Sequence, residues 1–139
     1  MGQITQPRGV RNNNPLNIKR SSQVFLGETT NIYETTFKTF KSVVWGFRAA
    51  ICIIRTYIML KDCKTPYAII HRWCPDETAD RYTVFVCRKV GIDPNQEINF
   101  AQRTIIVALV SAMAIFETGV TFDNTIINDA YQKAIDLRS

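Results

Sequence analysis

Glu117 occupies the most unusual position of any acidic residue in this chain. It follows residues 104–116 (TIIVALVSAMAIF), which carry no charge, and it stands two residues before Gly119. Such a run is typical of a buried helix that a glycine ends. Apolar surroundings and the negative end of a helix dipole both disfavour an ionised carboxylate, so they raise its pKa. A carboxylic acid that stays protonated near neutral pH can act as a general acid, which is the role we predict for Glu117.

Glu34 is the candidate for a second carboxylate. It lies in residues 31–36, a polar stretch before Phe37 that is typical of a hairpin tip. Glycoside cleavage uses two carboxyls across a cleft: one protonates the leaving oxygen, and the other activates water or stabilises positive charge on the sugar. The simpler alternatives are a solvated Glu34 and a Glu117 that pairs with a nearby donor.

Other acidic residues compete for the second position. Three of them fit the start of a helix, where an acid interacts well with the helix dipole. The competitors are Glu28, Asp76, Glu77 and Asp80, of which the last three have this simpler interpretation.

Polar and aromatic side chains supply candidate binding groups. In residues 8–19 (RGVRNNNPLNIK), the asparagines suit a turn, and Asn13, Asn14 and Asn17 can bind amide and hydroxyl groups of a ligand. The alternative is a loop whose asparagines bind their own backbone. Among the aromatic residues, Tyr33 and Tyr82 are candidates for contact with a sugar, whereas the tryptophans lie at the spacing of core residues.

Metal and thiol chemistry have little support in the sequence. The four cysteines form no CxxC pair and His71 is the single histidine, so we predict neither a zinc site nor any other cofactor. His71 and Cys74 stand one helical turn apart and could form a nucleophilic pair, but such pairs normally join different elements. The sequence neither supports nor excludes a disulfide bond between Cys63 and Cys74.

The elements that must position these residues are mainly helical. Short β-branched and aromatic stretches at residues 23–26 and 35–40 predict a small hairpin or a three-stranded patch, after irregular structure over residues 1–22. Five helices follow: one from Ser42, one from Thr65-Pro66 to Pro75, one from near Asp76 to Gly91, the apolar one that ends at Glu117, and one from near Asp123. The fold class is therefore mainly α (α+β), with residues 1–139 as a single domain.

The composition limits the classes of partner that the chain is expected to bind. The 139 residues are 46% hydrophobic and carry a formal charge of +5, which favours anionic partners. Because the basic residues are scattered rather than clustered, they disfavour nucleic acid as a partner. We expect cytoplasmic synthesis without a signal peptide, and no stretch of about 18 apolar residues that would span a membrane.

Residues 8–18 (RGVRNNNPLNI) resemble the opening of small phage and prophage virion-type proteins. Later segments of the chain fit the same family: Phe37-x-x-Phe40, Gly46-x-Arg48-Ala49, Arg72-Trp73-x-Pro75 and Ala114-Ile115-x-Glu117-x-Gly119. Leu16 departs from this family, which usually has a glycine there. Membership implies a virion protein with other virion proteins as partners.

A more distant similarity is to cell-wall N-acetylglucosaminidases of the lysozyme superfamily. Residues 13–19 resemble their Asn-Asn turn, Glu34 the acid of their hairpin, and residues 114–119 (AIFETG) their acid-bearing helix. The parts follow in the same cyclic order but start at a different point, which implies a circularly permuted lysozyme-like domain.

This similarity implies a peptidoglycan hydrolase that cleaves the β-1,4 glycan strand, of glucosaminidase, muramidase or lytic transglycosylase type. Glu117 would be the general acid and Glu34 the second carboxylate. Tyr82, Tyr33 and the asparagines would orient the sugar. The protein would act at the bacterial cell wall after delivery by a virion or by lysis. The alternative is a non-catalytic virion or wall-binding module of the same fold.

Overall fold

The computed structural model describes residues 6–137 of the chain. These residues form six helices and one two-stranded sheet, joined by loops. A mainly helical fold with a small N-terminal hairpin is thereby confirmed. The elements, in chain order, are α1 (Arg8–Arg11), β1 (Glu28–Thr29), β2 (Thr39–Phe40), α2 (Val43–Leu60), α3 (Pro66–Trp73), α4 (Ala79–Val90), α5 (Arg103–Thr118) and α6 (Asn124–Asp136).

The helices begin and end where local chemistry favours it. Thr65 caps α3 by accepting a hydrogen bond from the Ala68 N–H, with Pro66 at the first helical position, and Asp123 caps α6 in the same way. Gly119 ends α5 with a φ of 74°, a left-handed conformation that glycine adopts without steric cost. The predicted starts of α3 and α6 and the predicted end of α5 are confirmed, whereas α3 ends two residues before the predicted Pro75 and α4 starts three residues after the predicted Asp76.

The hairpin differs from its prediction at the first strand. β1 and β2 are antiparallel and pair Glu28 with Phe40, and residues 23–26 form no strand. These residues have other partners, because the Gln23 carbonyl accepts a hydrogen bond from the Lys38 ammonium and the Phe25 ring is buried in the core. Within the predicted irregular segment, residues 8–11 form α1, and residues 1–5 lie outside the described part.

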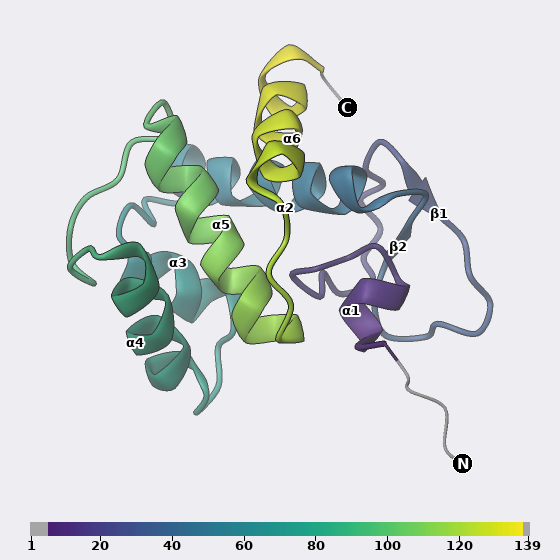
Figure 1. Cartoon of the computed structure of the whole chain (residues 1–139), viewed down its shortest axis with the longest axis horizontal. Coiled ribbons are helices and arrows are strands. Elements are labelled where there is room, and N and C mark those ends of the chain that lie inside the picture. The colour runs from purple at the N-terminus through teal and green to yellow at the C-terminus, as the bar shows by residue number, and fades with distance from the viewer. Residues whose placement is uncertain (1–5, 138–139) are drawn as a thin grey trace.

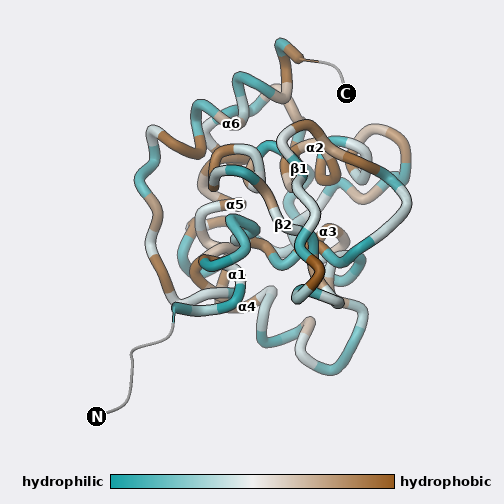
Figure 2. The backbone as a smooth tube through the Cα atoms, turned by 90° about the vertical axis from the view of Figure 1, so that its right-hand side faces the viewer, coloured by the Kyte–Doolittle hydropathy of each residue, from teal (hydrophilic) through white to brown (hydrophobic). Residues whose placement is uncertain are grey.

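The helix α5 runs through the middle of the molecule. In Figure 1, α3 and α4 lie to one side of it, while α1 and the hairpin lie to the other. The α2 helix crosses behind α5 and packs against α6. Figure 2 shows hydrophilic and hydrophobic residues alternating along α6, as expected of an amphipathic helix with one face on the core.

Two arginines of α2 hold the last turn of α6. The Arg48 side chain is fully buried and donates from Nη2 to the Leu137 carbonyl at 2.8 Å, and Arg55 donates to the Ala134 carbonyl at 2.7 Å. Cations at this end of a helix offset the partial negative charge of its unpaired carbonyls. The arginines therefore join α2 and α6 by charge as well as by apolar packing.

The α2 helix also meets the length and composition of a membrane span. The sequence prediction concerned an unbroken apolar stretch, which Arg48 interrupts. The mean hydropathy over the 18 residues of α2 is nevertheless that of a candidate membrane span. Half of the helix is buried inside the fold, as in the core helix of a globular domain, so this finding is weak evidence for a membrane span.

Candidate active site

Glu117 lies in the last turn of α5 and accepts two hydrogen bonds. Tyr82 Oη donates to Oε2 at 2.9 Å, and Asn17 Nδ2 donates to Oε1 at 2.9 Å. The three side chains come from α5, α4 and the N-terminal turn, so helix packing and one long-range loop contact together bring them to one place.

Asn17 reaches Glu117 because the turn before it is tightly anchored. Its φ of 54° is left-handed, a conformation that asparagine tolerates better than most residues. The fully buried Asn14 side chain accepts from the Ile18 N–H and donates to the carbonyls of Ile18 and Lys38. Trp73 adds a bond from its ring nitrogen to the Leu16 carbonyl at 3.1 Å.

The same turn lies directly on the backbone of α2. A Cβ atom at Gly46 would stand 2.0 Å from the Asn13 carbonyl oxygen, a distance that no side chain can occupy. Glycine at this position therefore sets how closely the turn approaches the core, and with it the position of Asn17.

Tyr82 is held as a hydrogen-bond donor. Its side chain is buried, and its ring stacks on Phe116 at 4.1 Å between centroids. Burial, together with the negative charge of Glu117, raises the pKa of Tyr82 well above its ordinary value. The hydroxyl therefore keeps its proton and points it at the carboxyl.

The pKa of Glu117 is raised, mainly because burial disfavours the charged form. The hydrogen bonds from Asn17 and Tyr82 act in the opposite direction, and the nearby charge of Asp76 raises the pKa further. This agrees with the sequence argument on apolar surroundings. Burial therefore favours the protonated form of Glu117, and the hydrogen bonds from Asn17 and Tyr82 favour its ionised form.

Glu117 lines a cleft of about 320 Å³. One wall comes from the N-terminal turn and the hairpin, and the other comes from α2 and the connection between α3 and α4. The lining residues are Asn17, Ile18, Lys19, Phe37, Ile53, Tyr57, Trp73, Cys74, Pro75, Asp76 and Glu117. Aromatic walls with a few polar groups between them suit a sugar chain.

A separate, larger cavity of about 930 Å³ lies between the end of α2, residues 97–103 and α6. Its acidic residue, Glu97, is exposed to solvent and the lining is otherwise largely apolar. We place the candidate site in the smaller cleft, because that is where a partly buried acid meets two oriented donors.

Glu34 is surrounded by donors of its own. Arg8 binds both carboxylate oxygens, at 2.8 and 2.7 Å, and Asn12 adds a third bond at 2.9 Å. The N–H groups of Thr36 and Phe37 also donate to it. These bonds, led by that from Arg8, hold the pKa of Glu34 far below its ordinary value. Glu34 lines a separate small polar cavity rather than the Glu117 cleft.

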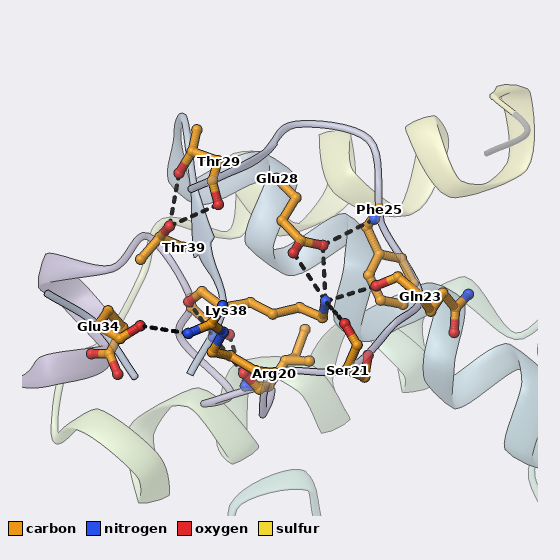
Figure 3. Close-up of polar contacts among 11 residues, drawn as sticks. Arg20, Ser21, Gln23, Phe25, Glu28, Thr29, Glu34, Lys38 and Thr39 are labelled. Carbon is orange, nitrogen blue, oxygen red and sulfur yellow. Dashed lines mark hydrogen bonds and ion pairs between the residues drawn. The ribbon is translucent and has the colours of Figure 1, made fainter. Parts of the chain in front are cut away.

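A buried ion pair lies beside Glu34 in the hairpin. Figure 3 shows the Lys38 ammonium pointing toward the Glu28 carboxylate and toward the carbonyls of Ser21 and Gln23. The ammonium lies 3.0 Å from Glu28, and the Lys38 side chain is 1% exposed. This polar network fixes the segment before β1 onto β2.

The other predicted binding residues lie away from Glu117. The Asn13 side chain donates to the Phe40 carbonyl, and that of Asn14 is fully used by the backbone contacts described above. Tyr33 is 90% exposed on the loop before Glu34. Of the seven predicted site residues, the structure therefore brings together Glu117, Tyr82 and Asn17.

The contacts of His71 and Cys74 differ from those of a nucleophilic pair. The His71 nitrogens bind the Tyr67 carbonyl and Asp80, each at 2.9 Å. Burial and the neighbouring Asp76 raise the pKa of Cys74 to about 11, which disfavours the thiolate. All four cysteines are free thiols. Within residues 6–137, no group of three or more His, Cys, Asp or Glu side chains is placed to hold a metal ion.

Sequence reasoning missed two parts of the cleft. Trp73 has the spacing of a packing residue but lines the cleft. Asp76 fits the start of a helix but also lies in the same cleft as Glu117. The string Trp-Cys-Pro-Asp at residues 73–76 was the available signal, because a proline after a helix turns the chain and exposes the residues beside it.

Comparison with known proteins gives one clear relationship. No protein-family model matches the chain. The chain is similar to protein P5 of Pseudoalteromonas phage PM2, with 41% identity over 117 residues, which cover 81% of this chain and 71% of that protein. This chain therefore belongs to the family of the phage protein P5.

Proposed function

We propose that this protein is a phage virion component that cleaves the glycan strand of peptidoglycan, with Glu117 as the general acid. Membership in the family of a phage protein supports the first part of the proposal. The observation that carries the second part is a partly buried acid with a raised pKa, held by Tyr82 and Asn17 in a cleft with aromatic walls.

The geometry suits proton transfer to a leaving oxygen. Burial favours the protonated form of Glu117, and in the proposed reaction this form gives its proton to the glycosidic oxygen as the C–O bond breaks. The carboxylate left behind accepts the hydrogen bonds from Tyr82 and Asn17, so it forms with its two donors already in place. Tyr82 and Asn17 are therefore positioning residues for this acid.

The arrangement is also consistent with a permuted lysozyme-like domain. In that superfamily the acid-bearing helix comes directly before the Asn-Asn turn, whereas here the turn comes first and α5 is the next-to-last helix. The two parts are nevertheless neighbours in space: α1 packs against α5, and a Cβ atom at Gly9 would meet Thr118 at 3.0 Å. The same fold with its chain termini moved to a different point would have this order of elements.

We assign Glu34 to the support of the N-terminal segment. A carboxylate that already accepts five hydrogen bonds has little capacity left for water or substrate. Its bonds to Arg8 and Asn12 fix the segment that carries Asn17. A basic surface would assist binding, because peptidoglycan carries peptide carboxylates. The protein would meet this substrate at the cell wall, delivered by the virion or released by lysis.

The test is release of soluble muropeptides from purified peptidoglycan. Wild type is expected to release them, and Glu117→Gln is expected to lower the rate by about 10²-fold or more, the usual contribution of a general acid. Glu97→Gln is the matched control, because it makes the same change at an exposed site outside the cleft. A wild type that releases no muropeptides rejects the enzymatic proposal. Equal rates for wild type and Glu117→Gln reject Glu117 as the acid.

The alternative function is a non-catalytic virion or wall-binding module. The relationship to a phage protein supports this alternative better than the enzyme, because it speaks for a phage protein and contains no information on chemistry. Sedimentation of the protein with peptidoglycan, unchanged by Glu117→Gln and without release of muropeptides, is the result expected of such a module.

A further inference from the structure

We propose that Asp76 is the second carboxylate of this site, the group that stabilises the positive charge developing on the sugar as Glu117 gives up its proton. The inference rests on the proposed function. It replaces Glu34 in that role with a residue that lies in the same cleft as the acid.

The placement of Asp76 follows from the turn between α3 and α4. Pro75 ends the continuation of α3, and the Asp76 Oδ1 then accepts the Thr78 N–H at 2.8 Å, while the Asp76 carbonyl accepts the Ala79 N–H. This turn starts α4 and leaves the Asp76 side chain exposed at the wall of the cleft. Both hydrogen bonds that the side chain accepts, from Thr78 and from the Cys74 thiol, go to Oδ1.

The pKa values of the two carboxyls in the cleft are shifted in opposite directions. The hydrogen bond from the Thr78 N–H, followed by that from Cys74, lowers the pKa of Asp76, whereas burial raises the pKa of Glu117. Other titratable groups around Glu117 are Tyr82 on α4, Cys74 beside Asp76, and Lys19 in the cleft lining. The two shifts go in opposite directions, toward a proton donor at Glu117 and a carboxylate at Asp76, the division of roles that two-carboxylate glycosidases require.

The chemistry needs the negative charge in this place. Proton transfer from Glu117 breaks the C–O bond and leaves positive charge shared between the anomeric carbon and the ring oxygen. A carboxylate in the same cleft lowers the energy of that state until a water oxygen bonds to the anomeric carbon and a proton of that water returns to Glu117. Glu34 is less suited to this role, because Arg8 neutralises its charge and its oxygens are occupied.

The experiment compares Asp76→Asn with Asp93→Asn in the muropeptide assay. Asp93 forms the same turn elsewhere in the chain: its Oδ1 accepts the Asn95 N–H at 2.8 Å, and its carbonyl accepts the Gln96 N–H. Asparagine keeps an oxygen for both turns, so each variant loses only a charge. We expect Asp76→Asn to lower kcat by about 10²-fold with little change in KM, and Asp93→Asn to match wild type.

A second readout does not depend on activity. Because the charge of Asp76 raises the pKa of Glu117, Asp76→Asn should lower that pKa, as measured by ¹³C NMR titration of the Glu117 carboxyl. A kcat for Asp76→Asn equal to that of Asp93→Asn overturns the inference and leaves Glu117 as the proposed acid. Absence of activity in wild type overturns the proposed function, and this inference with it.

Discussion

Glu117 is placed where its charged form destabilises the fold. Its pKa in the folded protein is raised above the value in the unfolded chain, so its favourable contribution is present at low pH and is lost as pH rises through the folded pKa. Glu117→Gln should therefore raise the melting temperature at neutral pH, and the difference should vanish below about pH 4, where the carboxyl is protonated in both states. Thermal unfolding followed by circular dichroism at both pH values measures this.

A glutamine fits the same contacts. Its oxygen can accept from Asn17, and its amide can donate to the Tyr82 oxygen, whose own proton can turn to the Met113 carbonyl. Glu97→Gln should show no such pH-dependent gain, because that side chain is exposed. A lower melting temperature for Glu117→Gln at neutral pH would mean that the two donors outweigh the cost of burial.

Tyr82 offers a prediction about the acid itself. The hydrogen bond from its hydroxyl stabilises the Glu117 carboxylate, so Tyr82→Phe should raise the pKa of Glu117 further. In the proposed activity, the loss of rate at high pH would then move to higher pH. NMR titration of the Glu117 carboxyl checks the same shift without substrate, and an unchanged or lower pKa would contradict the assigned hydrogen bond.

At the scale of elements, Gly46 controls the approach of the N-terminal turn to α2. Gly46→Ala should destabilise the fold by about 1–3 kcal/mol, because the added methyl group must displace the Asn13 carbonyl. It should also lower the proposed activity, because the turn carries Asn17. Urea unfolding measures the first effect. Gly91→Ala, where a Cβ atom meets nothing within 4 Å, is a control that carries only backbone strain.

The ion pair of Lys38 and Glu28 holds the hairpin. Lys38→Met leaves the Glu28 carboxylate without its cation in a mostly buried place, and we expect a loss of about 3 kcal/mol of stability. The double variant with Glu28→Gln should recover part of that loss, because no unpaired charge remains. Urea unfolding of the single and double variants forms the test. Equal stability of the two would show that the charge of Glu28 is solvated.

The sequence predicted elements well where their signals were local. The ends of α3, α5 and α6 follow from Thr65-Pro66, Gly119 and Asp123, each of which acts on its own helix. The predicted strand at residues 23–26 was wrong because the conformation of these residues depends on Lys38, which lies on the far side of the hairpin and binds the Gln23 carbonyl. Local propensity does not contain a contact of that kind.

The same distinction applies to the candidate site. Glu117 was identifiable because its apolar helix and its glycine cap are neighbours in the sequence. The saturation of Glu34 by Arg8 and the placement of Asp76 in the cleft depend on tertiary packing, and neither residue type nor spacing reveals them.

For the whole molecule, one core predicts one unfolding transition. Buried side chains from the N-terminal turn, the hairpin and helices α2 to α6 form a single hydrophobic cluster. Small domains of this kind unfold cooperatively. Tryptophan fluorescence from Trp45 and Trp73 and far-UV circular dichroism should therefore give the same midpoint in urea. Separate midpoints would divide the chain into two folding units.

The bond between Asn17 and Glu117 joins residues that are 100 positions apart. On the ribosome, at roughly 5–20 residues per second, Glu117 is added about 5–20 seconds after Asn17. Until then the N-terminal turn has no acid to bind, and a chain released early contains neither a cleft nor a proton donor. A nascent chain that has not yet reached residue 117 therefore lacks the acid of the proposed activity, and its N-terminal turn lacks a long-range partner.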